Sequence, residues 1–276
     1  MTEVIGREKS FISTLREDKW WIGPMLVLFG LLSFIIYSTW AAWQGEHFWV
    51  GSEGFGGYLS PFYSPTFFID SAKEGIPPIS HTLFGEWPAW LNWLPGHSPA
   101  WLILIFPLSF RFTCYYYRKA YYRAFTFSPP ACAVGGIPQK NYKGETGILW
   151  VQNLHRYAMY FAIIFIFLLS YDAIMAFFRD GEFGVGVGSI VLLINPILLG
   201  GYTFGCHSLR HLIGGRMDCF SCSHSAEHAH SRWKIVTYLN RRHQMFAWFS
   251  LVWVGLSDVY VRLVSMGVIT DLNTWV

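Results

Sequence analysis

Runs of apolar residues separated by polar segments predict an all-α chain with five helices that cross a bilayer. The first run, PMLVLFGLLSFIIYSTWAAW, occupies residues 24–43 and approaches the roughly 20 residues that a transmembrane helix needs. Four further runs predict spans at residues 99–117, 148–178, 187–213 and 239–266. We therefore expect an all-α integral membrane protein, with residues 1–276 forming a single membrane domain in which the five helices make one bundle.

A long connection, residues 44–98, separates the first two predicted spans and is rich in glycine, proline and aromatic residues. Its apolar fragments YLSPFYSPTFFI and FGEWPAWLNWL are too short or too interrupted by proline to cross a membrane. We expect these fragments to pack against the bundle on its outer side.

The distribution of Lys and Arg predicts the orientation of the chain. The segment before the first span carries four, residues 111–147 carry six and residues 210–242 carry six, whereas residues 44–98 and 179–187 carry one each. Because cytoplasmic loops are enriched in Lys and Arg, the N-terminus is predicted to be cytoplasmic and the C-terminus to lie outside.

Composition supports a membrane protein and gives little reason to expect a nucleic-acid partner. Hydrophobic residues make up 53% of the chain and charged residues 13%, against about 25% charged residues in ordinary soluble domains. The net charge is only +3. Aromatic residues reach 19%, which is typical of proteins with interfacial aromatic belts.

Candidate chemistry concentrates in residues 206–230, which hold three of the five cysteines and five of the ten histidines. Thiolate and imidazole ligands favour zinc, copper or iron over magnesium and calcium. His155 lies about two turns into the third predicted span and His243 opens the fifth, so they are expected at a similar depth near the cytoplasmic surface. The candidate metal ligands are Cys206, His207, His211, Cys219, Cys222, His155 and His243. A structural disulfide is not expected on that side.

Three kinds of metal centre remain open. A haem b needs two imidazoles from facing helices, and no CxxCH motif for covalent attachment is present. A Rieske-like [2Fe-2S] centre needs two thiolates and two imidazoles, but the C-x-H and C-x-x-H loops of soluble Rieske domains are missing. A structural zinc site could form from Cys219, Cys222 and His224 with His228 or His230.

Charged residues near the outer ends of two predicted spans offer a further, simpler interpretation. Asp172 lies in the third span, and Asp258 and Arg262 lie one turn apart in the fifth. We expect a helix-end ion pair, with a proton path as the alternative.

Several motifs together give the chain a recognisable pattern: FRFTCYYYRKAYYRAF, SPPACAV, NLHRYAMYF, CHSLRH, DCFSC and LNRRHQMFAW. With five predicted spans, this pattern resembles the membrane-anchor (cytochrome b-type) subunit of succinate dehydrogenase, in the single-chain kind found in actinobacteria. The resemblance covers about residues 99–270 and extends poorly to the outer connection.

The resemblance implies a location in the bacterial plasma membrane and a role in a complex, with no catalysis by the chain alone. The partners it implies are a flavoprotein that oxidises succinate, an iron-sulfur subunit on the cytoplasmic face and menaquinone or ubiquinone, with a higher oligomer left open. The better-known five-helix anchors hold two b haems. The resemblance to the actinobacterial type implies a Rieske-like cluster instead, which the supply of Cys and His here favours.

Quinone is expected near the cytoplasmic surface, where an aromatic wall and hydrogen-bond donors can hold its carbonyl oxygens. Depth alone makes Trp20, Arg156 and Arg210 candidates. Interfacial anchoring or contact with a partner subunit is the alternative for each of them. A single-haem membrane cytochrome and a membrane protein with a structural zinc loop are the alternative functions.

Overall fold

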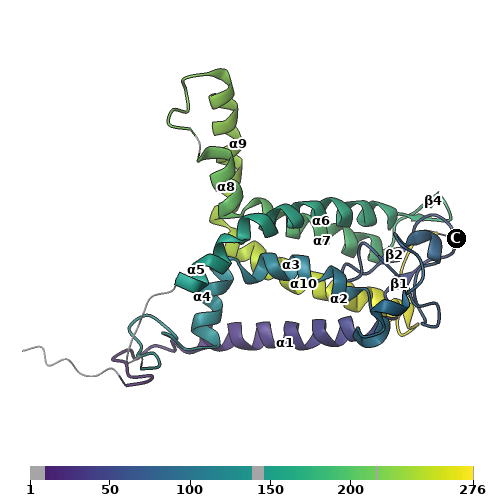
Figure 1. Cartoon of the computed structure of the whole chain (residues 1–276), viewed down its shortest axis with the longest axis horizontal. Coiled ribbons are helices and arrows are strands. Elements are labelled where there is room, and N and C mark those ends of the chain that lie inside the picture. Colours follow the sequence, from purple (N-terminus) through teal and green to yellow (C-terminus); the bar gives the residue numbers. More distant parts are fainter. Residues whose placement is uncertain (1–9, 139–145, 216, 276) are drawn as a thin grey trace, which may run out of the picture. The chain divides into compact units, whose positions relative to one another are not determined.

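The computed structural model describes residues 10–138, 146–215 and 217–275, without the side chains of residues 146–148 (Figure 1). The chain divides into two compact units. Unit one comprises residues 1–35 and 111–155, and unit two comprises residues 36–110 and 156–276. Several helices contain residues of both units.

Four helices in the described part of the chain are long and apolar enough to cross a membrane. They are α1 (Ile22–Gln44), the stretch Leu149–Met175 formed by α5 (Thr146–Asn153) and α6 (His155–Met175), α7 (Val187–Phe204) and α10 (His243–Ser265). Large apolar side chains lie on their outside: Leu26 and Phe167, for example, are 67% and 68% exposed. Such exposure is expected of helices surrounded by lipid, because a soluble protein rarely presents large apolar patches.

The second predicted span is shorter than expected. Residues 99–117 were predicted as one crossing helix, but the apolar helical stretch is Ala100–Phe112, divided into α2 (Ala100–Ile103) and α3 (Ile105–Phe112). At about 1.5 Å per residue, this stretch covers roughly 20 Å, whereas the hydrocarbon core measures about 30 Å. The chain leaves the helix at Cys114, whose φ and ψ are −68° and 131°, before α4 (Tyr115–Ala124) begins. The prediction of five spanning helices is therefore not confirmed.

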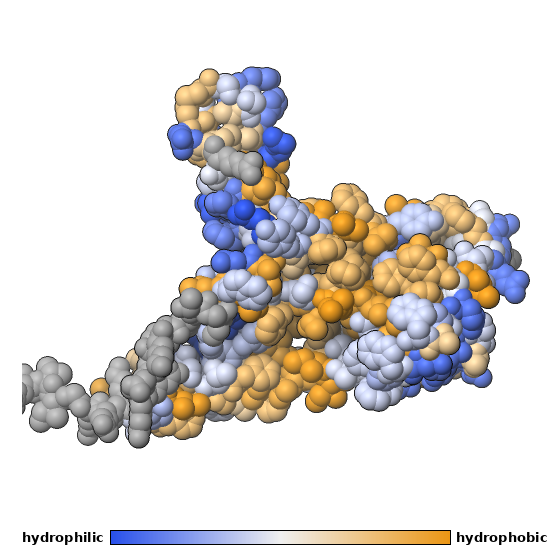
Figure 2. All heavy atoms as spheres, in the orientation of Figure 1, coloured by the Kyte–Doolittle hydropathy of each residue, from blue (hydrophilic) through white to orange (hydrophobic). Residues whose placement is uncertain are grey.

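In unit two, α7 and α10 pack along each other, and α3 contributes aromatic contacts to α7 and α6. The Trp253 indole of α10 donates to the backbone carbonyl of Val191 on α7 over 2.9 Å. The ring of Phe110 meets that of Tyr202 with centroids 5.2 Å apart, and the ring of Phe106 meets that of Phe161 at 5.0 Å. Figure 2 shows hydrophobic residues along this helical part of the unit and hydrophilic residues gathered toward its ends.

The connection between α1 and α2 contains no spanning helix in its described residues, as predicted, and it is well packed. The strands β1 (Trp49–Val50) and β2 (Tyr58–Leu59) pair antiparallel, with Trp49 opposite Leu59. The rings of Phe48 and Tyr63 stack with centroids 4.0 Å apart. The connection also holds three short helices, η1 (Ile79–His81), η2 (Ala89–Leu91) and η3 (Pro95–His97). The other two strands, β3 (Phe178–Arg179) and β4 (Glu182–Phe183), lie between α6 and α7.

The expected ion pair is present near the C-terminal end of α10. Arg262 Nε lies 3.5 Å from Asp258 Oδ2, and both side chains are almost fully buried. Tyr37 donates to the same oxygen over 2.5 Å, and the Ser60 hydroxyl donates to the other carboxylate oxygen. Charges within a membrane segment are costly unless they are paired and hydrogen-bonded, so this network lets Asp258 and Arg262 be buried together.

A helical hairpin of α8 (His207–Gly214) and α9 (His224–Arg241) lies between α7 and α10 in the sequence. Figure 1 shows it projecting away from α6 and α7. The Arg210 guanidinium lies 4.6 Å from the ring centroid of Trp233, which joins the two helices. The predicted span 187–213 therefore ends at Phe204, and His207 and His211 belong to the hairpin.

Candidate functional site

Four breaks between consecutive helices each carry a cysteine or a histidine. Cys114 is the N-cap of α4 and Cys206 is the N-cap of α8. His155 is the first residue of α6 and His243 is the first residue of α10. The breaks thus supply two thiols and two imidazoles at the ends of helices, where helix geometry fixes the direction of the side chain.

In unit one, Cys114 and His155 are both buried, with 3% and 7% of their surfaces exposed. The hydroxyl oxygen of Thr113, next to Cys114, lies 2.9 Å from His155 Nδ1. A hydrogen bond on one ring nitrogen fixes the orientation of an imidazole, as is common for metal-binding histidines. Unit one therefore holds a buried thiol and a buried imidazole, and the imidazole is oriented by the residue that precedes the thiol in the sequence.

In unit two, Cys206 is 1% exposed and its Sγ accepts a hydrogen bond from the backbone N–H of Ser208 over 3.3 Å. The ring of His243 stacks on that of Tyr202, which lies one turn before Cys206, with centroids 4.7 Å apart. Amide hydrogen bonds to sulfur and a position at a helix N-terminus both favour the thiolate. Unit two therefore also holds one buried thiol, and the imidazole of His243 is packed on an aromatic ring of α7.

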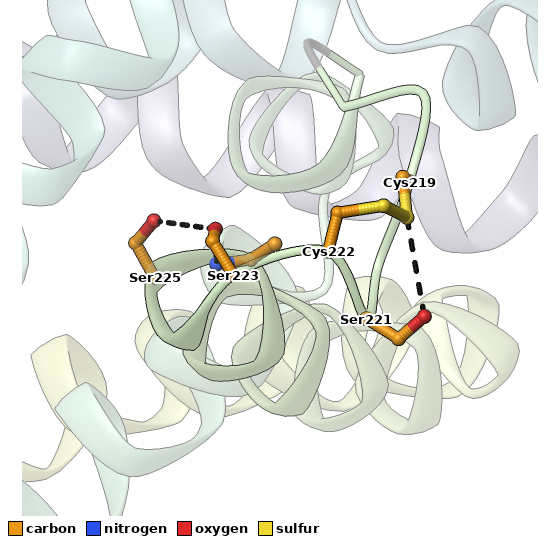
Figure 3. Close-up of a disulfide and its surroundings, with 6 residues drawn as sticks. Cys219, Ser221, Cys222, Ser223 and Ser225 are labelled. Carbon is orange, nitrogen blue, oxygen red and sulfur yellow. Dashed lines mark hydrogen bonds between the residues drawn. A yellow bond between two sulfur atoms is a disulfide. The ribbon is translucent and has the colours of Figure 1, made fainter.

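The CxxC motif adopts a different state from the one predicted. Cys219 and Cys222 are joined in a disulfide on the segment between α8 and α9 (Figure 3). The expectation of reduced thiolates is therefore wrong for this structure. A disulfide sulfur carries no thiolate charge, so neither residue can bind a metal in this form.

The histidines of the hairpin lie at its surface. His207 and His211 are exposed on α8, and His211 Nδ1 lies 3.0 Å from Arg156 Nη2. His224 and His228 are exposed on α9, with their Nε2 atoms 3.0 Å apart. His230 stacks on Phe220. Over residues 10–138, 146–215 and 217–275, no group of three or more His, Cys, Asp and Glu side chains is arranged to hold a metal ion.

The quinone candidates differ in their surroundings. Arg156 is exposed at the start of α6, where it contacts His211. Arg210 donates from Nε to Thr237 Oγ1 over 3.1 Å and lies over Trp233, so its guanidinium is engaged within the hairpin. Trp20 is half-buried just before α1 in unit one.

Cys114 was missed from the sequence as a candidate ligand. Hydropathy placed it inside a continuous span, where a cysteine behaves as a small apolar residue. Its position directly before the polar, basic run YYYRK was the available signal, because a cysteine at a helix start differs chemically from one within a helix.

Comparisons with known proteins agree with this arrangement of helices. The model of the family described as "Actinobacterial succinate dehydrogenase subunit SdhC" matches residues 22–267. A chain of the Mycobacterium smegmatis Sdh1 complex in the apo form is 42% identical, with a TM-score of 0.81 over 95% of this chain and 94% of that chain. No curated protein sequence matches. The chain belongs to the actinobacterial succinate dehydrogenase SdhC family, which confirms the resemblance seen in the sequence.

Proposed function

We propose that this membrane subunit of a succinate dehydrogenase complex passes electrons from an iron-sulfur subunit to a membrane quinone. The observation that carries the proposal is the set of two cysteines and two histidines at the four helix breaks, three of them buried. Ligand-type residues in membrane proteins are usually functional, because their burial is costly. A flavoprotein, an iron-sulfur subunit and the bacterial plasma membrane complete the proposed setting.

The proposed centre is a Rieske-like [2Fe-2S] cluster, and its candidate ligands are the helix-break residues, Cys114 and His155 in unit one and Cys206 and His243 in unit two. This set replaces Cys219, Cys222, His207 and His211, which are disulfide-bonded or exposed. A bound cluster of this kind takes up and releases one electron at a time. The donor types match its requirement for two thiolates on one iron and two imidazoles on the other.

The chain's own residues would tune such a centre. The Ser208 amide donates to Cys206 Sγ, and hydrogen bonds to cluster sulfurs raise the reduction potential. The contact with Thr113 holds the imidazole of His155 in one orientation. The burial of Cys114 and Cys206 keeps water away from their sulfur atoms.

A haem b remains the alternative centre, because its iron takes two axial imidazoles and each unit holds one histidine at a helix break. Optical and electron paramagnetic resonance spectra of the purified complex distinguish the two. A rhombic signal with a low average g value in the reduced complex supports the cluster. A Soret band with a b-type reduced spectrum would replace the cluster by a haem, and the absence of both features would overturn a redox centre in this chain.

We propose that Arg156, with His211 beside it, is a hydrogen-bond donor to a quinone carbonyl near the cytoplasmic surface. The contact between the two side chains brings two nitrogen donors together at the start of α6. Arg156→Gln should raise the KM for quinone about tenfold, the effect of losing about 1.4 kcal/mol of binding. Arg210→Gln is the matched control and should leave the KM unchanged. Equal effects of the two variants would contradict the assignment.

A further inference from the structure

The tip of the hairpin carries two metal-ligand spacings in succession. Cys219 and Cys222 form C-x2-C, and His224 and His228 form H-x3-H with only Ser223 between the two motifs. Both spacings are those of zinc sites that take two thiolates and two imidazoles. This tip lies apart in sequence from the four helix breaks, so an inference about it does not rest on the proposed electron transfer.

The Nε2 atoms of the two imidazoles lie next to each other. His224 and His228 lie one turn apart on α9, and their Nε2 atoms are 3.0 Å apart with the rings at 78° to each other. Two nitrogens bound to one zinc at about 2.0–2.1 Å are separated by roughly 3 Å. The helix therefore presents half of a metal site without any rearrangement of its backbone.

The carboxylate of Glu227 lies next to the ring of His224. Glu227 Oε2 lies 3.9 Å from His224 Nδ1, the ring nitrogen that faces away from His228. Histidine ligands commonly donate their second ring N–H to a carboxylate, which orients the ring and raises its basicity. Glu227 is placed to take this role for His224.

The two cysteines would supply the other two ligands of such a site. In the disulfide, however, their sulfur atoms are bonded to each other and cannot bind a metal. Cys222 immediately precedes Ser223, the N-cap of α9 (Figure 3). The Ser223 hydroxyl accepts from the Ala226 amide over 3.2 Å. The positive end of an 18-residue helix stabilises a thiolate beside it. Cys222 is exposed, so a reductant can reach the bond.

We propose that the hairpin tip is a site for a zinc-class divalent ion, and that reduction of the Cys219–Cys222 disulfide makes it available. A dithiol reductant breaks the Cys219–Cys222 bond, delivering two electrons and two protons and becoming a disulfide itself. On metal binding the two new thiols release their protons, and both sulfurs join His224 Nε2 and His228 Nε2 around the ion. The oxidised hairpin lacks the two sulfur ligands and keeps only the histidine pair.

His230 provides a control within the same helix. Its ring stacks on Phe220 with centroids 4.7 Å apart and lies 5.8 Å from Trp233. This contact places it in the packing of the hairpin and away from the pair formed by His224 and His228. His230→Gln should therefore leave metal affinity unchanged.

The test is a Zn²⁺ titration of the purified complex, once as isolated in the oxidised form and once after dithiol reduction and removal of excess reductant. The reduced complex should bind one additional Zn²⁺ per chain, at least about tenfold more tightly than the oxidised form. His224→Gln and His228→Gln should each weaken binding by at least about tenfold, and Glu227→Gln by about 10- to 100-fold. When Co²⁺ replaces Zn²⁺, the absorption spectrum should show a thiolate-to-metal charge-transfer band only after the Cys219–Cys222 disulfide has been reduced.

Equal zinc binding by the oxidised and reduced forms would overturn the proposal. The same loss in His230→Gln as in His228→Gln would also overturn it. The paramagnetic signal of the iron-sulfur centre, recorded on the same samples, should be unchanged in every hairpin variant. That readout confirms assembly of each variant and separates this proposal from the one on electron transfer.

Discussion

Asp271 shows how a single carboxylate joins distant parts of unit two. Its oxygens accept hydrogen bonds from Tyr58 Oη over 2.7 Å, from Tyr260 Oη over 2.5 Å and from the Gly188 amide over 3.0 Å. Arg179 Nη2 lies 3.5 Å away. Burial alone would raise the pKa of Asp271, but the hydrogen bonds from Tyr260, Tyr58 and Gly188 outweigh it and lower the pKa below its usual value of 3.8.

Asp271→Asn should destabilise the protein by about 1–3 kcal/mol, because it removes the charge that these donors share. A lowered pKa means that the carboxylate contributes its stability above pH 3.8 and loses it as the pH falls through the folded-state pKa. Thermal unfolding followed by tryptophan fluorescence from pH 7 to pH 3 measures both effects. Wild type should lose more stability than the variant toward acid pH, and the exposed control Asp218→Asn should behave as wild type. Parallel curves for wild type and Asp271→Asn would contradict this role.

At the scale of elements, the sequence predicted where the helices lie better than it predicted the breaks between them. The first span was predicted at residues 24–43 and is observed as Ile22–Gln44, because an apolar run of membrane length has few alternatives. The end of α7 depends on a residue far along the chain: Asn240 Nδ2 donates to the carbonyl oxygen of Gly205 over 2.8 Å. A local pattern cannot show such a partner, so the predicted span ran on to residue 213.

The helix α9 was missed although its signal is in the sequence. Its inward residues, Ala226, Ala229, Trp233 and Val236, recur at intervals of three and four, and Ser223 caps its start. The many Cys and His residues of this segment favoured its interpretation as a metal-binding loop over its interpretation as a helix. Cys114 was missed because the apolar run around it predicted one continuous helix, whereas the structure has a helix break at this residue.

The close packing of α8 against α9 makes Gly214 sensitive to substitution. An added Cβ would lie 2.4 Å from Trp233 Cδ1 and 2.9 Å from its Nε1, well inside contact distance. Gly214→Ala should therefore cost about 1–3 kcal/mol of overpacking and loosen the hairpin. Limited proteolysis should show faster cleavage within residues 207–241. Gly23→Ala, with no atom within 4 Å of its Cβ, should cleave as wild type, and an unchanged rate for Gly214→Ala would contradict this packing.

At the scale of the whole molecule, the distribution of Lys and Arg predicts that the segment holding Cys132 and the hairpin face the cytoplasm, and that residues 44–98 face outside. Cys132 has a free, exposed thiol, and Glu53 is exposed in the connection. A membrane-impermeant maleimide should label Cys132 in inverted vesicles and a Glu53→Cys, Cys132→Ser variant in right-side-out vesicles. The reverse pattern would invert the orientation and place the Cys132 segment and the hairpin outside.

The central claim is that this chain carries a redox centre whose thiolate ligands are cysteines at the helix breaks. It is tested most directly by electron paramagnetic resonance of the reduced, purified complex, comparing Cys114→Ser and Cys206→Ser with Cys132→Ser and Cys219→Ser. The first two variants should lose the rhombic signal with a low average g value, and the last two should keep it in full. Retention of that signal in Cys114→Ser and Cys206→Ser, or its loss in Cys219→Ser, would contradict the account.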